Sequence, residues 1–254
     1  MSLVPLPSSI IPFLEPYLPR EKNDRPFVTL TWAQSIDSRI AAAPGTQTKI
    51  SHPETKTMTH YLRAYHDAIL VGIGTVLADD PKLTCRYGNF SKIRPVVVDP
   101  AAKWDYSKST ISTLCQELKA LAPIILTNRE AEPLKENVEL LQSHGGSYRA
   151  LQFLLEYEHN WIEVLRELHA CDIKSVMIEG GAKVINSLLV SENLVDSVIV
   201  TIGPVFLGKQ GVEVSPPAGL ELQDVAWWRG TTDSVMAARL ITLPEVEDLD
   251  ETTE

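Results

Sequence analysis

Short, almost fully apolar runs that end in glycine or in Asp-Pro are the feature that most limits what this chain can fold into. Residues 68–71 read Ala-Ile-Leu-Val and are followed by Gly72, and residues 96–98 are three valines followed by Asp99-Pro100. Residues 175–178 are similar and precede a glycine pair. Runs of this kind are typical of strands that are covered on both faces, as in parallel sheets.

Helical patterns of about ten residues separate these runs. Strands are expected at 27–32, 68–71, 96–98, 124–126, 150–153, 175–178, 197–201 and 235–243. Helices are expected at 53–65, 111–121, 132–143, 160–170 and 182–190. This alternation favours an α/β fold with a mostly parallel twisted sheet. The last two strands have no helix between them, so one of them is expected to run antiparallel. The sequence predicts a single three-layer domain over residues 26–244.

The two ends of the chain differ from this body. Residues 1–25 carry five prolines, which predicts an irregular arm on the surface whose apolar residues pack against the domain. The net charge is −10, and six of the acidic residues lie within 245–254. A segment this polar buries too little apolar surface to offset its ordering entropy, so the tail is expected to be disordered.

Several classes of protein are disfavoured by what the sequence lacks. No apolar run approaches the roughly 18 residues of a membrane span, and the start lacks the basic and apolar regions of a secretion signal. Cys85, Cys115 and Cys171 lie far apart, which suits a reducing compartment. We therefore expect a cytoplasmic protein without a metal site. The body has no basic patch for nucleic acid, and no G-x-S-x-G motif supports acyl transfer.

A first ligand-binding turn is indicated by Gly72-Ile73-Gly74-Thr75, which leaves the apolar run at 68–71. Gly72 and Gly74 permit close approach to the backbone, and Thr75 and Asp79 add polar groups. A glycine-rich turn from strand to helix is a common setting for phosphate. Leu77 stands where a Rossmann fingerprint has its third glycine. The alternative interpretation is a tight turn after a core strand.

A second such turn is Glu179-Gly180-Gly181-Ala182. Backbone N–H groups at the start of the following helix favour a pyrophosphate. Glu179 comes at the carboxyl end of a strand, where open α/β sheets bind ligands, and its carboxylate suits substrate hydroxyls. Two such turns together indicate a nucleotide site, although both can also be ordinary strand-to-helix connections.

Basic side chains suited to a substrate phosphate are Lys49, Arg63, Arg86 and Arg94. Arg63 lies on the predicted helix 53–65, and Arg86 follows the Asp79-Asp80-Pro81 turn. Guanidinium groups bind phosphate oxygens in pairs, so these two arginines are the stronger candidates. A solvated surface charge is the alternative for each of them. Each histidine is interpreted as a surface or core residue, although one of His52, His60 and His66 can face the cleft.

These segments together resemble one family. The matching pieces are residues 35–38, 62–63, 67–76, 79–86, 94–99, 179–182 and 203–208, in the family's order. The chain resembles the riboflavin-biosynthesis reductases, whose fold is similar to dihydrofolate reductase. It has Asp37-Ser38 where that family usually has Asp-Gly. It lacks the zinc deaminase signature of the fused bacterial members, so it resembles the stand-alone fungal and archaeal type.

The resemblance implies an oxidoreductase that uses NADPH and forms a homodimer. The implied reaction reduces the ribosyl group of 2,5-diamino-6-(ribosylamino)-4(3H)-pyrimidinone 5′-phosphate to a ribityl chain. Together with the glycine turns, it gives as cofactor contacts Ala33, Lys49, Gly72, Gly74, Thr75, Asp79, Gly181, Ala182, Lys183, Val184 and Ile185. It gives as substrate contacts Ser35, Gln47, Arg63, Leu83, Arg86 and Glu179. Glu179 is also the expected catalytic residue.

Two other functions stay open at this point. One is a dihydrofolate or pterin reductase on the same fold, and the other is a non-catalytic nucleotide-binding protein. The proton donor is open as well, with Glu179, Asp37 and water as candidates.

Overall fold

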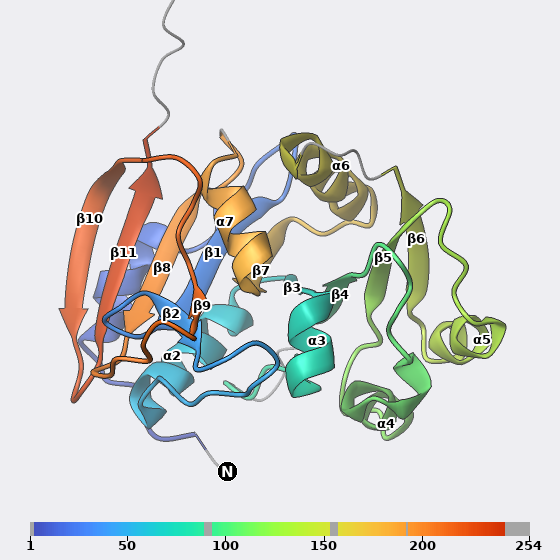
Figure 1. Ribbon diagram of the computed structural model, residues 1–254, viewed down its shortest axis with the longest axis horizontal. Helices are drawn as coiled ribbons and strands as arrows, with labels where there is room; N and C mark the ends of the chain where they lie inside the picture. Colours follow the sequence, from blue (N-terminus) through green and yellow to red (C-terminus); the bar gives the residue numbers. More distant parts are fainter. Residues whose placement is uncertain (1–2, 89–92, 153–156, 192, 242–254) are drawn as a thin grey trace, which may run out of the picture.

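The computed structural model describes residues 3–88, 93–152, 157–191 and 193–241. Helices cover both faces of one large sheet, which crosses the whole of Figure 1 from β10 to β6. Within the described residues this sheet has nine strands, in the order β10-β11-β8-β1-β7-β3-β4-β5-β6. The predicted single α/β domain with a mostly parallel sheet is confirmed.

The elements follow one another along the chain as the sequence pattern indicates. The strands of the large sheet are β1 (Phe27–Gln34), β3 (Ala68–Gly72), β4 (Arg94–Val98), β5 (Ile124–Asn128), β6 (Ser147–Leu151), β7 (Ser175–Gly180), β8 (Ser197–Ile202), β10 (Leu222–Arg229) and β11 (Ser234–Leu240). A small second sheet pairs β2 (Arg39–Ala41) with β9 (Val212–Glu213). The helices are α1 (Ile10–Leu14), α2 (Pro53–Ala64), α3 (Ile73–Asp79), α4 (Thr110–Gln116), α5 (Lys135–Ser143), α6 (Tyr157–Ala170) and α7 (Ala182–Leu189), with 3₁₀ turns at Glu15–Tyr17 and Tyr106–Lys108.

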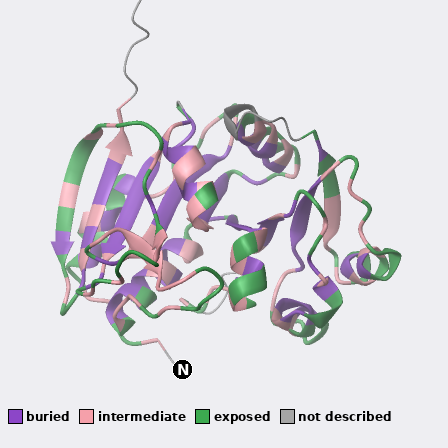
Figure 2. Cartoon of the chain, in the orientation of Figure 1, coloured by how far each residue is buried: buried purple, intermediate pink, exposed green. Residues whose placement is uncertain are grey.

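The parallel part of the sheet runs from β8 to β6, and its strands are joined by crossovers that contain helices. β11 pairs antiparallel with both β8 and β10, which confirms the expected change of direction at this end. β10 was not predicted, because this edge strand carries polar and half-exposed residues instead of an apolar run. Figure 2 shows the resulting contrast between the buried central strands and the exposed edge.

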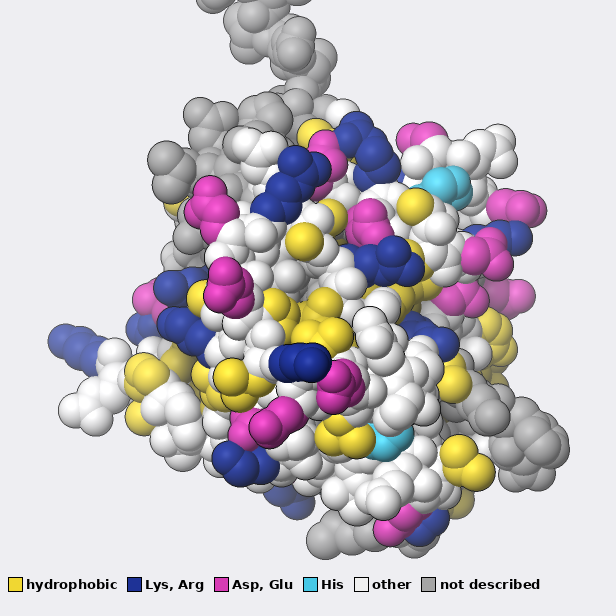
Figure 3. Space-filling model, turned by 90° about the vertical axis from the view of Figure 1, so that its right-hand side faces the viewer, with side chains coloured by type: hydrophobic (Ala, Val, Ile, Leu, Met, Phe, Trp, Pro, Cys, Tyr) yellow, Lys and Arg dark blue, Asp and Glu magenta, His cyan; other side chains and the backbone are white. Residues whose placement is uncertain are grey.

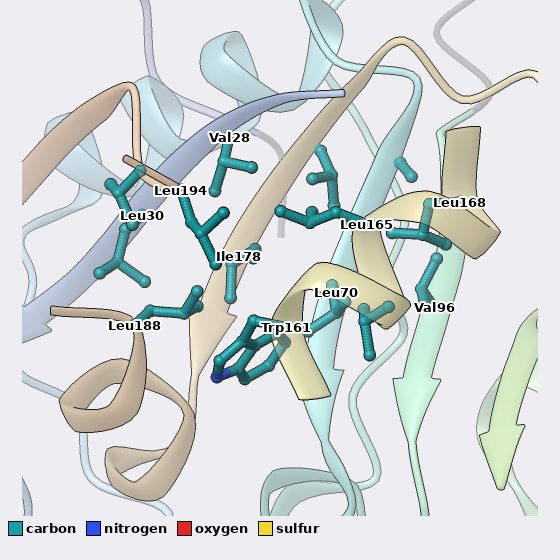
Figure 4. Close-up of a cluster of buried hydrophobic side chains, with 14 of the residues drawn as sticks. Val28, Leu30, Leu70, Val96, Trp161, Leu165, Leu168, Ile178, Leu188 and Leu194 are labelled. Carbon is teal, nitrogen blue, oxygen red and sulfur yellow. The ribbon is translucent and has the colours of Figure 1, made fainter. Parts of the chain in front are cut away.

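Alternation along each strand sends side chains to two separate cores. On one face, Leu70 and Ile178 pack with Trp161 of α6 and Leu188 of α7 (Figure 4). On the other face, Met177 packs among residues of α1 and α2, and the neighbouring strands pack against α3, α4 and α5. The three predicted layers follow from this alternation, because each face of the sheet is apolar and must be covered.

The N-terminal arm is more ordered than its prolines suggest. Ile10 and Leu14 of α1 are fully buried against α2 and the sheet, so the expectation of irregular structure is wrong for this segment. Thr57 of α2 donates to Val4 O at 3.0 Å, and Ser197 of β8 donates to Tyr17 O at 2.8 Å. The arm therefore connects α2 with β8. The acidic tail at 245–254 lies outside the described residues.

Some element ends differ from the predictions for local reasons. The helix predicted at 111–121 ends at Gln116, because Leu118 adopts a left-handed backbone with φ of 57°. The strand predicted at 150–153 begins earlier, at Ser147, because Ser147 pairs with Ile124 of β5. Phe153 lies outside the described residues.

Within the described residues, none of the helices is both long enough and apolar enough to cross a bilayer. On the side drawn in Figure 3, basic and acidic side chains are interspersed instead of gathered by sign. Among the described residues, no cluster of three or more His, Cys, Asp or Glu side chains could hold a metal ion.

Candidate active site

The two glycine turns lie against each other at the carboxyl edge of the sheet. β3 and β7 are parallel neighbours, so the connections to α3 and α7 leave from the same edge. A Cβ atom on Gly181 would lie 3.1 Å from Thr75 Oγ1, and one on Gly72 would lie 3.0 Å from Val184 Cγ2. Gly180 has φ of +122°, which only glycine adopts easily, and its peptide bond to Gly181 is cis. The close packing of the turns therefore depends on glycine.

Glu179 occupies an irregularity between β7 and β3. Leu70 pairs with Ile178, and the next residue, Val71, pairs with Gly180, so Glu179 is an extra residue on β7. Bulges of this kind redirect side chains and are common beside active sites. Here the carboxylate of Glu179 is directed to the α2 side of the sheet.

Arg63 of α2 holds this carboxylate with two hydrogen bonds. Its Nε donates to Glu179 Oε1 at 2.7 Å, and its Nη2 donates to Oε2 at 2.6 Å. A third bond runs from Nη1 to Thr84 O at 2.8 Å. The two side chains expose only 14% and 18% of their surface. Arg63 thus joins α2, β7 and the segment after α3, and two of its five N–H groups remain for a ligand.

Arg86 contacts the ring of His60, a residue of α2 that lies one helical turn before Arg63. The guanidinium Nε and Nη2 atoms lie 3.1 and 2.7 Å from His60 Nε2, and the backbone N–H of Arg86 donates to Nδ1 at 3.2 Å. Burial, with the charges of Arg63 and Arg86, lowers the pKa of His60 to about 3, so the ring is neutral at physiological pH. The sequence did not single out His60 among the histidines. Its spacing of three from Arg63, which places the two side chains on one side of the helix, is the one signal for this contact.

Asp79 has a buried oxygen, Oδ1, without a hydrogen-bond partner. Burial raises the pKa of its carboxyl group. Gly74, near the start of the same helix, is exposed, and a Cβ atom there would meet nothing within 4 Å. The first turn of α7 has no side-chain cap. An unused acceptor, an open glycine and uncapped N–H groups fit a nicotinamide dinucleotide, which carries hydroxyl and amide donors as well as a pyrophosphate.

The other predicted cofactor contacts differ in accessibility. Ala33, near the end of β1, and Ala182 and Val184 of α7 are half-buried, and Lys49 and Lys183 are exposed. Ile185 is fully buried in the core, and its N–H donates to Gly181 O at 3.0 Å. Neither its side chain nor its amide is therefore available to a ligand, because both are used by the fold.

The predicted substrate contacts divide in the same way. Ser35 is buried, donates to Asp37 Oδ1 at 2.5 Å and accepts from Arg39 N at 2.9 Å. Leu83 is buried next to the segment that holds Arg86, whereas Gln47 is exposed. Arg94 lies at the amino end of β4, on the opposite edge of the sheet, where it donates to Ala122 O at 2.6 Å.

Asp37 fixes one loop to another. It accepts hydrogen bonds from Ser35 Oγ and from the backbone N–H groups of Leu207 and Gly208 at 3.0 and 2.7 Å. These bonds lower the pKa of Asp37 to about 2. Asp37 is therefore ionised at neutral pH and does not suit the role of proton donor.

Comparison with known proteins agrees with this geometry. Residues 26–236 match the family described as the RibD C-terminal domain. A protein of Debaryomyces hansenii named 2,5-diamino-6-ribosylamino-4(3H)-pyrimidinone 5′-phosphate reductase is 56% identical over 94% of this chain and 100% of its own length. The protein of the same name from Saccharomyces cerevisiae is 44% identical over 94% of this chain and 99% of its own length.

A solved structure supports the same assignment. The riboflavin biosynthesis reductase of Saccharomyces cerevisiae is 40% identical, with a TM-score of 0.79, and the match covers 92% of this chain and 100% of that one. The fold, the paired glycine turns and these matches lead to one conclusion: the chain belongs to the RibD C-terminal domain family.

Proposed function

We propose that this protein is the NADPH-dependent reductase that converts 2,5-diamino-6-(ribosylamino)-4(3H)-pyrimidinone 5′-phosphate to its ribitylamino derivative in riboflavin biosynthesis. The observation that carries the proposal is the Arg63–Glu179 ion pair, which lies beside Arg86 and next to two glycine turns at one edge of the sheet. Relatives at 56% and 44% identity bear the name of this reductase, which favours it over a dihydrofolate reductase or a non-catalytic protein.

The cofactor half of the site consists of the two turns. Bound NADPH would supply the hydride, and the protein's task is to position it. Thr75 and Asp79 of α3 would accept hydrogen bonds, and the uncapped start of α7 would donate to the pyrophosphate. Asp79 is the sharpest part of this assignment, because its buried Oδ1 has no partner in the protein. Lys183 would reach the 2′-phosphate that distinguishes NADPH from NADH, since it is exposed on the first turn of α7.

The substrate half of the site consists of α2, the segment at 83–86 and Glu179. The guanidinium of Arg86 would bind the 5′-phosphate, and Glu179 would orient the ribosyl hydroxyls. Arg63 would contact the substrate with its two remaining N–H groups while it holds Glu179 in place. Leu83 and Ser35 would act by shaping the loops around the substrate, because both are buried.

The proton for the reaction comes from water in this proposal. Reduction forms a C1′–H bond, breaks the bond from C1′ to the ring oxygen, and leaves a hydroxyl group on the opened chain, so one proton must accompany the hydride. Both oxygens of Glu179 accept from Arg63, and Asp37 is ionised by its three hydrogen bonds. The proposal therefore assigns the proton to water and gives neither side chain the role of proton donor.

We further propose that the protein is a cytoplasmic homodimer. Its three cysteines are free thiols, as in proteins of reducing compartments. The edge strand β10 exposes Trp227 by 61% and Val225 by 46%, which is the kind of apolar surface that a second copy covers. Sedimentation analysis at micromolar concentration tests the dimer, and a monomer under those conditions would contradict it.

The decisive experiment is an assay of purified protein with the diaminopyrimidine substrate. NADPH absorbance should fall, and mass spectrometry should find a product that is heavier by two hydrogen atoms. Dihydrofolate serves as the control substrate and should not be reduced. NADPH oxidation with dihydrofolate alone, or binding of NADPH without turnover of the pyrimidine, would overturn the proposal.

A further inference from the structure

The ring of His60 is contacted at both nitrogens by donors of one residue. The backbone N–H of Arg86 points to Nδ1 at 3.2 Å, and the guanidinium lies 2.7–3.1 Å from Nε2. The ring is well buried, with 5% of the residue exposed. A neutral imidazole has one acceptor nitrogen and one N–H, and neither an amide nitrogen nor a guanidinium can accept. Arg86 can therefore satisfy only one of the two ring nitrogens.

Protonation of the ring does not remove this mismatch, because both nitrogens would then be donors. His66, just after the end of the same helix, shows the complementary case. Its Nδ1 lies 2.7 Å from Leu62 O, an acceptor, and its Nε2 lies 2.8 Å from the hydroxyl of Thr29, a donor. The unmatched donors are thus a property of the His60–Arg86 pair and not of buried histidines in this fold.

An anion placed between the two side chains resolves the mismatch. When the guanidinium of Arg86 turns to the anion, the backbone N–H of Arg86 still donates to His60 Nδ1. That bond fixes the tautomer with hydrogen on Nε2. The Nε2–H then points to the place where the guanidinium was, and it donates to the same anion.

We propose that His60 is a ligand of the substrate's 5′-phosphate and binds it through Nε2–H beside the guanidinium of Arg86. This inference rests on the proposed function, because it takes the phosphate from that substrate. The neutral ring adds a directed hydrogen bond without adding charge to a site that already holds two arginines. His60 therefore contributes to the preference for a phosphorylated substrate over its dephosphorylated form.

A matched pair of variants separates the two nitrogens. His60→Asn keeps an acceptor near the position of Nδ1 and lacks the distal donor, whereas His60→Gln keeps an N–H donor near the position of Nε2. Loss of a hydrogen bond to phosphate should raise the KM of His60→Asn about ten- to hundredfold and leave kcat nearly unchanged. The dephosphorylated substrate should show no such rise. His60→Gln should lose much less.

The control is His66→Gln, a buried histidine just after the same helix whose ring contacts Leu62 O and the Thr29 hydroxyl. It should lower the melting temperature and leave the KM unchanged. If His60→Asn lowers only the stability and keeps the preference of the unmodified protein for the phosphorylated substrate, the residue is structural and the proposal is wrong.

Binding of ribose 5-phosphate tests the proposal without turnover. Nitrogen-15 NMR of histidine-labelled protein should show the Nε2–H tautomer of His60 in the complex, and His60→Asn should bind this probe about tenfold or more weakly. The Nδ1–H tautomer in the complex, or equal affinity, would overturn the role of His60. If His60 shows the Nε2–H tautomer and His60→Asn binds ribose 5-phosphate more weakly, but the protein does not reduce the pyrimidine, only the proposed function is contradicted.

Discussion

Both carboxylate oxygens of Glu179 accept hydrogen bonds from a single guanidinium, that of Arg63, at 2.7 and 2.6 Å. The two residues are 116 positions apart in the sequence, and they meet because an extra residue in β7 directs Glu179 to the face that α2 covers. The pair therefore reports on both the fold and the site, and substitutions in it should affect stability and activity together.

Glu179→Gln should lower the unfolding free energy by about 1.5–3 kcal/mol, because it removes a charged acceptor from the half-buried Arg63. The kcat/KM should fall as well. Combining it with Arg63→Met should cost less than the two single changes added together, since the double variant leaves no unpaired charge. Urea unfolding of all four proteins gives the coupling energy. Strict additivity would show that the ion pair contributes nothing.

Arg86→Ala should reduce kcat/KM for the phosphorylated substrate about ten- to hundredfold, the equivalent of roughly 1.5–3 kcal/mol for a hydrogen-bonded charge. Steady-state kinetics measures the change. Arg94→Ala is the matched control, because Arg94 lies at the opposite edge of the sheet and should affect only stability. An unchanged kcat/KM in Arg86→Ala would remove Arg86 from the substrate site.

Asp79→Asn should separate cofactor binding from stability. The buried Oδ1 of Asp79 has no partner, and burial raises the pKa of the carboxyl group, so the neutral side chain should make the cofactor-free protein roughly 1 kcal/mol more stable. NADPH should bind more weakly, while the KM for the pyrimidine stays the same. Urea unfolding and NADPH fluorescence measure the two effects.

Asp80→Asn provides the opposite pattern as a control. The carboxylate of Asp80 accepts from Thr110 N at 3.0 Å, at the start of α4, so its loss should reduce stability and leave NADPH affinity intact. A weaker affinity for the pyrimidine instead of NADPH in Asp79→Asn would mean that the two halves of the site are assigned in reverse.

Stability should fall as the pH is lowered from about 6.5 to 4, and the two buried histidines, His66 and His60, should both contribute to the change. Burial lowers the pKa of His66 from 6.5 to about 4, so the unfolded chain binds more protons than the folded one in this interval. The contribution of the neutral His66 ring to the unfolding free energy is fully present above pH 6.5 and is lost as the pH falls through 4. A displacement of this size corresponds to roughly 3 kcal/mol. His66→Gln should flatten the profile of unfolding free energy against pH, and an unchanged profile would contradict the assignment.

Ser38→Gly should stabilise the protein by a few tenths to about 1 kcal/mol. Ser38 adopts φ of 59°, a left-handed conformation that is costly for a residue with a Cβ atom. Glycine removes this cost, and the greater conformational entropy of glycine in the unfolded chain offsets part of the gain. Ser38→Ala keeps the Cβ atom and should bring no gain. The urea midpoint distinguishes the two, and equal midpoints would show that the backbone conformation at Ser38 is not costly.

Much of the parallel sheet could be predicted from the sequence, because its strands are apolar on both faces. The edge strand β10 could not, since it carries polar and half-exposed residues instead of an apolar run. The short pair β2 and β9 could not either, since its two strands lie far apart in the sequence. The helix α1 was concealed by the prolines around it. The turn at Ser38 was visible only as a departure from the Asp-Gly that the resembling family has.

The site divides in the same way. Sequence reasoning singled out Arg63, Arg86, Asp79 and Glu179 one at a time from residue type and motif position. It could not find that Arg63 holds Glu179, because pairing over such a separation requires the fold. It interpreted His60 as a surface or core residue, since a single histidine on a helix carries no sign of its partner. The contacts of Arg86 with both ring nitrogens supplied that sign.

The bonds that the N-terminal arm makes to α2 and β8 have a consequence for how the site works. They link the helix that carries His60 and Arg63 to β8, the strand beside β1. Because the arm ties α2 to the sheet, the positions of His60 and Arg63 depend in part on residues that lie outside the proposed site. A chain that began after Pro19 would keep all of the proposed site residues and lose both of these bonds, so α2 would be held in place less firmly.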